Sequence, residues 1–140
     1  MREIPWLDGG RSVYYWGAVA VSYVVLIAED DPATLTGLAG YLRGAGFSVI
    51  PLPSFVEAHR IMPFAKPDVV VAVVRLGEYN GLQLAVQARS LEPAPAIIVT
   101  SGFDDPVLKA EAERLGATFL MKPLEPAGLL ELISSKLRLR

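Results

Sequence analysis

Cysteine is absent from this chain of 140 residues, and histidine occurs only once, at His59. The lack of cysteine excludes disulfides, thiolate metal sites and a thiol nucleophile, and it fits a reducing compartment, so we expect a cytoplasmic protein. A strong excess of either charge is also missing, because 13 basic and 15 acidic residues leave a formal net charge of −2. Composition therefore gives no support to direct binding of nucleic acid.

One long apolar run covers residues 12–28. It falls short of the roughly 20 residues that a spanning helix needs, and its last part is required as a strand, so no membrane span is predicted. We interpret residues 1–22 as an aromatic N-terminal extension and residues 23–140 as one domain. Four large rings surround a turn signal at Asp8-Gly9-Gly10: Trp6, Tyr14, Tyr15 and Trp16. These rings either cover a sheet edge of their own domain or form a contact surface for a partner or a second subunit.

From residue 23 onward, apolar runs rich in β-branched residues alternate with segments of helical periodicity. The predicted strands cover residues 23–28, 47–52, 68–74, 96–99 and 117–121. The predicted helices begin near Pro32, Ser54, Gly81, Pro106 and Pro126, and a loop is expected over residues 75–80. Five strands alternating with five helices predict an α/β fold with a doubly wound five-stranded parallel sheet and helices on both faces.

Three consecutive acids, Glu29, Asp30 and Asp31, follow the first predicted strand, and Pro32 then begins a helix. In open parallel sheets, ligands bind at the carboxyl ends of the strands, so the cluster is a candidate site. The alternative is that Asp31 only caps the helix while Glu29 and Asp30 are solvated loop charges. The acids alone do not decide between the two interpretations.

Several motifs, in their order along the chain, resemble the receiver domain of bacterial two-component response regulators. They are Glu29-Asp30, the segment from Pro67-Asp68 to Asn80-Gly81, the run Ile97-Ile98-Val99-Thr100-Ser101-Gly102, and the run Gly116-Ala117-Thr118-Phe119-Leu120-Met121-Lys122-Pro123. The resemblance covers residues 23–140 and implies the flavodoxin-like strand order 2-1-3-4-5.

The resemblance also implies roles for particular residues. Glu29 and Asp30 correspond to the acidic pair that holds Mg²⁺ in the family. Thr100 corresponds to the switch hydroxyl, Phe119 to the switch aromatic, and Lys122 to the lysine of the site. The family usually has a cis bond between that lysine and the following proline, so a cis Lys122-Pro123 bond is expected.

One position departs from the family pattern. Counting from Pro67-Asp68 and from Asn80-Gly81 both place the phosphoacceptor aspartate at position 73, where this chain has Val73. Valine offers no nucleophile and no metal ligand, whereas phosphoryl transfer to a receiver requires an attacking carboxylate. Asp68 lies at the opposite end of the same strand, roughly 16 Å away at 3.3 Å per residue. Glu78, in the following loop, stays open as a substitute acceptor.

The charges at the expected pocket favour loss of the metal. Glu29 and Asp30 contribute −2, Lys122 contributes +1, and Arg75 at the pocket rim can bring another +1. Two charges about 4 Å apart interact by roughly 4 kcal/mol at an effective dielectric near 20, so the two cations can replace an ion. We expect no cofactor, and Mg²⁺ bound at most weakly. Without a phosphoryl group nothing drives the switch, so Thr100 is interpreted as a residual feature or a capping hydroxyl, and Phe119 as a core or rim aromatic.

These observations predict a degenerate receiver that signals through protein contacts and is not an enzyme. The expected partners are a histidine kinase, a phosphotransfer protein or an output protein, with a homodimer as a further possibility. The expected contact surface includes Leu108, Phe119 and Leu129. The alternative is a flavodoxin-like domain that binds a small molecule or nucleotide, but no glycine-rich phosphate loop follows the first strand. No DNA-binding output domain is expected, unless the chain is part of a longer regulator.

Overall fold

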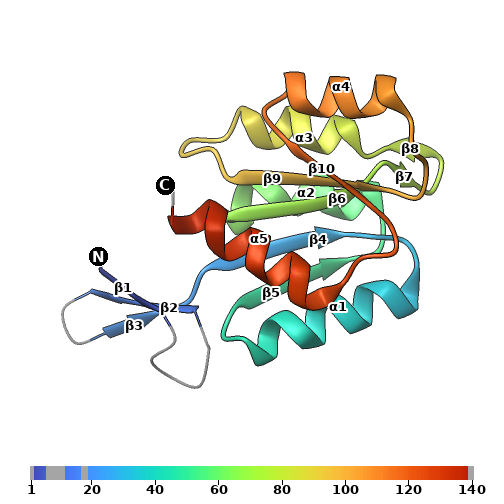
Figure 1. Ribbon diagram of the computed structural model, residues 1–140. Coiled ribbons are helices and arrows are strands. Elements are labelled where there is room, and N and C mark those ends of the chain that lie inside the picture. Colours follow the sequence, from blue (N-terminus) through green and yellow to red (C-terminus); the bar gives the residue numbers. More distant parts are fainter. Residues whose placement is uncertain (1, 6–11, 17–18, 139–140) are drawn as a thin grey trace.

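The computed structural model of the chain describes residues 2–5, 12–16 and 19–138. Its central feature is a sheet of five parallel strands: β4 (Val24–Ala28), β5 (Ser48–Leu52), β6 (Val69–Val73), β9 (Ala96–Ser101) and β10 (Thr118–Met121). The strands lie side by side in the order β10-β9-β6-β4-β5 (Figure 1). Numbered along the domain, this is the order 2-1-3-4-5, which confirms the predicted fold.

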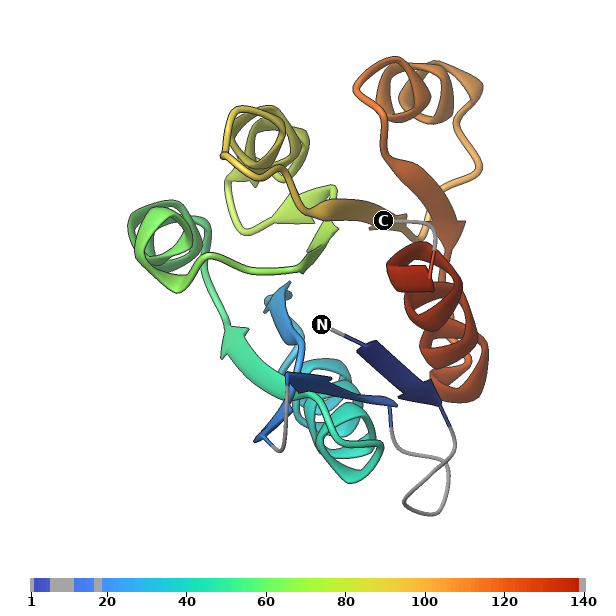
Figure 2. The ribbon, with the colours of Figure 1, turned by 90° about the vertical axis from the view of Figure 1, so that its left-hand side faces the viewer.

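Helices cover both faces of the sheet (Figure 2). One face carries α1 (Pro32–Gly44) and α5 (Pro126–Arg138), and the other carries α2 (Phe55–Ala65), α3 (Leu82–Arg89) and α4 (Pro106–Arg114). Two helices begin as the sequence predicts, with a capping aspartate before a proline. Asp31 accepts hydrogen bonds at the start of α1 and Asp105 does so at the start of α4. These caps satisfy amide groups that have no partner within the helix.

The core consists of two apolar clusters, one under each layer of helices. Every residue of β6 is buried, which is the result expected for a central parallel strand covered on both faces. Leu129 lies in the cluster under α1 and α5 and is almost fully buried. The prediction that Leu129 contributes to a contact surface is therefore wrong, because its helical spacing turns it toward the sheet.

The outer edge of β5 has two unusual features. Pro51 lies in the strand, in register with Ile27 of β4, and has no backbone N–H group. The N–H of Ser48 and the carbonyl of Leu52 form hydrogen bonds on the β4 side of the strand. Because backbone N–H and C=O groups alternate in direction along a strand, those of residues 49 and 51 point away from β4. The outward carbonyl of Val49 accepts a hydrogen bond from the Arg43 guanidinium at 3.1 Å.

Two segments differ from the expected organisation. Residues 75–80, predicted as a loop, form a short antiparallel ribbon of β7 (Arg75–Leu76) and β8 (Tyr79–Asn80), closed by Gly77 and Glu78. Gly77 has φ +61°, a conformation that costs glycine little, so it allows the two-residue hairpin turn.

The N-terminal extension contains a three-stranded antiparallel sheet of β1 (Arg2–Pro5), β2 (Ser12–Trp16) and β3 (Val19–Val21). These three strands were not predicted from the sequence. Trp6 and the turn Asp8-Gly9-Gly10 lie outside the described residues, so the expected roles of the aromatic rings stay predictions. Among the described residues, none of the helices combines the length and apolar character needed to cross a membrane.

Candidate functional site

The predicted site residues gather at the carboxyl edge of the sheet. Glu29 and Asp30 follow β4, Val73 ends β6, Thr100 lies near the end of β9, and Lys122 follows β10. The parallel arrangement explains this grouping, because it brings the carboxyl ends of all five strands to one edge. Val73 is in direct register with Thr100 across β6 and β9.

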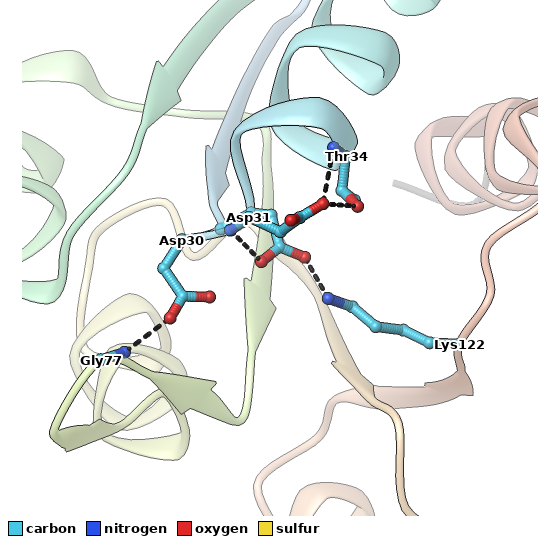
Figure 3. A network of polar contacts seen from close by, with 6 residues as sticks. Asp30, Asp31, Thr34, Gly77 and Lys122 are labelled. Carbon is cyan, nitrogen blue, oxygen red and sulfur yellow. Dashed lines mark hydrogen bonds and ion pairs between the residues drawn. The ribbon is translucent and has the colours of Figure 1, made fainter.

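Glu29 is the buried acid of the cluster, with 3% of its surface exposed. Its carboxylate forms an ion pair with the Lys122 ammonium group and accepts the backbone N–H of Asp31 at 3.0 Å (Figure 3). Lys122 reaches the pair from the loop after β10, and its peptide bond to Pro123 is cis, as predicted. A buried carboxylate needs such partners because burial without them is costly.

The other two acids are exposed, and each accepts a hydrogen bond from a backbone N–H group. Asp30 accepts the backbone N–H of Gly77 at 3.0 Å, which ties the end of β4 to the β7–β8 turn (Figure 3). Asp31 caps α1 by accepting the backbone N–H of Thr34 at 3.0 Å and the Thr34 hydroxyl at 2.5 Å. The hydroxyl bond and then the amide bond lower the pKa of Asp31 below its usual value. The helix-cap interpretation thus holds for Asp31.

Val73 is apolar and buried, with 5% of its surface exposed, and belongs to the cluster under α2, α3 and α4. Its carbonyl oxygen lies so close to Gly81 that a Cβ atom at position 81 would overlap it. Gly81 also donates its N–H to the Val74 carbonyl at 2.6 Å. The end of β6 is therefore fixed by backbone contacts that only glycine at position 81 permits.

The switch candidates and Arg75 occupy different surroundings. Thr100 is buried at the end of β9, and Phe119 packs at the margin of the cluster that contains Val73. Arg75 lies over the Phe103 ring, with its guanidinium carbon 4.5 Å from the ring centroid. Within residues 22–138, ion pairs join Lys122 to Glu29 and Arg114 to Glu111. Arg75 therefore makes no ion pair with the acids after β4 in this part of the chain. Glu78 is exposed in the β7–β8 turn.

The sequence model of the response regulator receiver domain matches residues 25–134, which is most of the chain. This chain belongs to the response regulator receiver domain family. The matched region begins inside β4 and ends inside α5, so it contains all five parallel strands and every residue of the candidate site.

Curated relatives include the transcriptional regulatory protein GlrR of Escherichia coli K12, which is 31% identical over 114 residues. That match covers 81% of this chain and 26% of GlrR. ZraR of Salmonella typhimurium is 30% identical with the same coverage. The chain therefore spans about a quarter of the length of these relatives.

Solved structures show the same fold. A CheY-like receiver domain protein from Methanospirillum hungatei JF-1 is 25% identical, with a TM-score of 0.80. The match covers 84% of this chain and 95% of that chain. A response regulator from Chloroflexus aurantiacus J-10-fl is 27% identical, with a TM-score of 0.76, covering 84% of this chain and 99% of that chain.

Three residues that shape the site were not identified from the sequence: Gly77, Gly81 and Phe103. Asn80-Gly81 was used only to count back to position 73, although a glycine next to a strand end is a signal for close backbone approach. The hydrogen bond from Gly77 to Asp30 could not be predicted from the local sequence, because the two residues are 47 positions apart in the chain. Nothing local marks Phe103 as the partner of Arg75.

Proposed function

We propose that this receiver domain signals through protein contacts without being phosphorylated at position 73. The observation that carries the proposal is the buried Val73 at the end of β6, in register with Thr100. A phosphoryl group is accepted by an attacking oxygen held in line, and a valine side chain has none. Asp30 and Glu29 are fixed on the neighbouring strand end by their bonds to Gly77 and Lys122.

The same contacts make the residues a poor fit for Mg²⁺. A divalent cation of this size prefers six oxygen ligands in near-octahedral geometry. Here the Glu29 carboxylate is engaged by Lys122, the Asp30 carboxylate is engaged by Gly77, and Val73 adds no ligand. No group of three or more metal-binding side chains lies together among the described residues. We propose a dissociation constant for Mg²⁺ on the order of millimolar or weaker, which calorimetric titration measures directly.

Intact-mass spectrometry after incubation with acetyl phosphate and Mg²⁺ tests the proposal. The wild-type chain should keep its mass, because no acceptor oxygen exists at position 73. Val73→Asp should gain one phosphoryl group, since the acids and Lys122 are already at the same edge of the sheet. Val73→Asn is the matched control, because it has nearly the shape of aspartate but no carboxylate.

Phosphorylation of the wild-type chain would overturn the proposal as stated. Glu78 would then be the first acceptor to examine, because it is exposed two residues before Asn80 in the β7–β8 turn. Peptide mapping of the modified chain, with Glu78→Gln alongside, identifies or excludes this position. We propose that the chain itself has no enzymatic activity and that a substitute acceptor is not used.

The partner is proposed by analogy with the family: a histidine kinase, a phosphotransfer protein or an output protein, with a homodimer as a further option. Exposed apolar side chains around α4 and β10 offer a contact surface, with Val107 and Met121 as its exposed members. Leu108 and Phe119 are only partly buried and can contribute, as proposed from the sequence. Sedimentation of the purified chain over a range of concentrations measures the oligomeric state.

A further inference from the structure

The β7–β8 ribbon contacts three separate parts of the domain, and none of these contacts involves a phosphoryl group. The ribbon directly follows Val73 and Val74, so it occupies the position of the loop after the central strand. Leu76 is its buried member and packs in the core beneath α2 and α3. The remaining contacts come from Arg75, Gly77 and Tyr79, each directed to a different element.

The turn of the ribbon is attached to β4. The Gly77 N–H donates to the Asp30 carboxylate at 3.0 Å, and a hydrogen bond to a charged group is stronger than a neutral one. The acid that corresponds to a metal ligand in the family therefore holds the turn in place through a backbone amide.

The second strand of the ribbon is attached to α2 by stacked rings. Tyr79 lies parallel to Phe55, with centroids 4.6 Å apart, and Phe55 in turn stacks on His59 at 5.7 Å. Gln87 of α3 fixes the far end, because its side-chain amide donates to the His59 carbonyl at 2.9 Å while its oxygen lies 3.0 Å from His59 Nδ1. The column therefore joins β8 to both α2 and α3, and such ring pairs contribute beyond simple burial.

The first strand of the ribbon contacts the loop between β9 and α4. The Arg75 guanidinium stacks on Phe103, which lies between the buried Ser101 and the Asp105 cap of α4. The loop itself holds Phe103 by one local bond, from its N–H to the Ser101 hydroxyl oxygen at 3.1 Å. A cation over an aromatic ring is a favourable contact even where both groups reach solvent.

We propose that the β7–β8 ribbon is a brace that holds the β9–α4 loop in one arrangement, with Asp30 and the ring column as its anchors and Arg75 as its contact to the loop. A loop can take part in a switch only if it can adopt two arrangements, so contacts that favour one of them reduce its capacity to respond. The brace deepens the proposed function, because it gives this chain a fixed loop without a phosphoryl group. Tyr79 acts here as a positioning residue, because its ring stacks on Phe55 of α2.

Amide hydrogen exchange measured by NMR on the full chain tests the brace at the Phe103 N–H. Arg75→Ala should raise its exchange rate about twofold to fivefold, the range expected from loss of one exposed cation–π contact. Tyr79→Ala should raise the same rate at least about twofold, because it removes the ring that stacks on Phe55 and anchors the ribbon. Tyr79→Phe keeps the ring and should exchange like the wild type. Val56→Ala, an exposed change on α2 next to Phe55, is the matched control for truncation.

Two results would overturn the brace: an unchanged Phe103 rate in Arg75→Ala, or a Tyr79→Ala effect confined to α2 and the ribbon. Both substitutions affect exposed side chains, so the variants should stay folded, and circular dichroism verifies this. The phosphorylation experiment has a separate readout. A chain that takes up a phosphoryl group can still show the braced exchange pattern, and an unphosphorylated chain can lack it.

Discussion

The carboxyl ends of β4 and β6 are neighbours in the same sheet, yet they differ in chemistry. The end of β4 carries three acids whose charges are met by Lys122, by Gly77 and by the first turn of α1. The end of β6 is apolar, and its close contacts are made by the backbone around Gly81. Charged groups therefore gather at one strand end, while the other ends in an apolar side chain.

The difference indicates that the acids contribute to the structure through their own hydrogen bonds and ion pair, independently of phosphoryl chemistry. Each acid of the cluster has an observed partner, so none depends on a metal ion for a favourable contact. A valine at position 73 adds no carboxylate to the edge, so it adds no repulsion between like charges there. Substitutions at the two strand ends test this difference, and the largest effect on stability is expected at the end of β6.

Gly81→Ala should destabilise the protein by about 3 kcal/mol, because the added Cβ would overlap the Val73 carbonyl oxygen, which belongs to the backbone and cannot rotate away. Gly37→Ala is the matched control. It lies on α1 with open space around the new atom and should stabilise the helix by up to about 1 kcal/mol. Urea denaturation of both variants measures the contrast, and equal effects would contradict the close approach.

Val73→Asp should cost about 2 kcal/mol of stability without metal, because it places a carboxylate at a buried position beside the existing acids. Millimolar Mg²⁺ should recover part of this loss, since an ion that binds only the folded state stabilises it. Val73→Asn should show no such recovery. Thermal unfolding with Mg²⁺ and with a chelator provides the comparison, and a wild type that responds like Val73→Asp would contradict weak binding.

Lys122→Met should destabilise the protein by about 2 kcal/mol, because it leaves the buried Glu29 carboxylate without its cation. The double variant Lys122→Met with Glu29→Gln should recover part of this loss, since a neutral amide costs less to bury. A double-mutant cycle in urea isolates the coupling between the two side chains. Strictly additive losses would show that the pair contributes nothing by itself.

The smallest effect is expected at Asp31. Its folded-state pKa is lowered, chiefly by the Thr34 hydroxyl, so its contribution to stability is present above the unfolded pKa and is lost as pH falls through the folded value. Asp31→Ala should therefore be less stable than the wild type at neutral pH, and the two should converge in acid. Denaturation at neutral pH and at a pH well below the ordinary aspartate pKa of 3.8 tests the sign. A constant difference would contradict it.

The alternation of strands and helices could be predicted from local periodicity, and the strand order followed from the resemblance to the receiver family. The same periodicity placed Val73 within a predicted strand. The helix caps at Asp31 and Asp105 follow from the same local signals. The ribbon was missed because a two-residue strand has no period to detect. The contacts of Asp30 and Arg75 were missed because each partner lies far away in the chain. Gly77 is 47 positions from Asp30, and Phe103 lies in the loop between β9 and α4.

The structure agrees with the expected position of one cation and differs from that of the other. Lys122 was expected near the acids, and the structure places it on Glu29. Arg75 was expected to add a second cation at the rim, but its guanidinium stacks on an aromatic ring instead. Formal charge could not separate these outcomes, because arginine also packs favourably on rings and only the fold decides which partner is within reach.

The outer edge of β5 affects the tendency of the protein to aggregate at high concentration. An open strand edge is a template on which another chain can add a strand, and repeated addition leads to fibrils. At this edge Pro51 has no hydrogen to donate, and the Val49 carbonyl is already occupied by Arg43. An incoming strand would meet two mismatches in three consecutive positions, so this side of the sheet resists self-propagating aggregation.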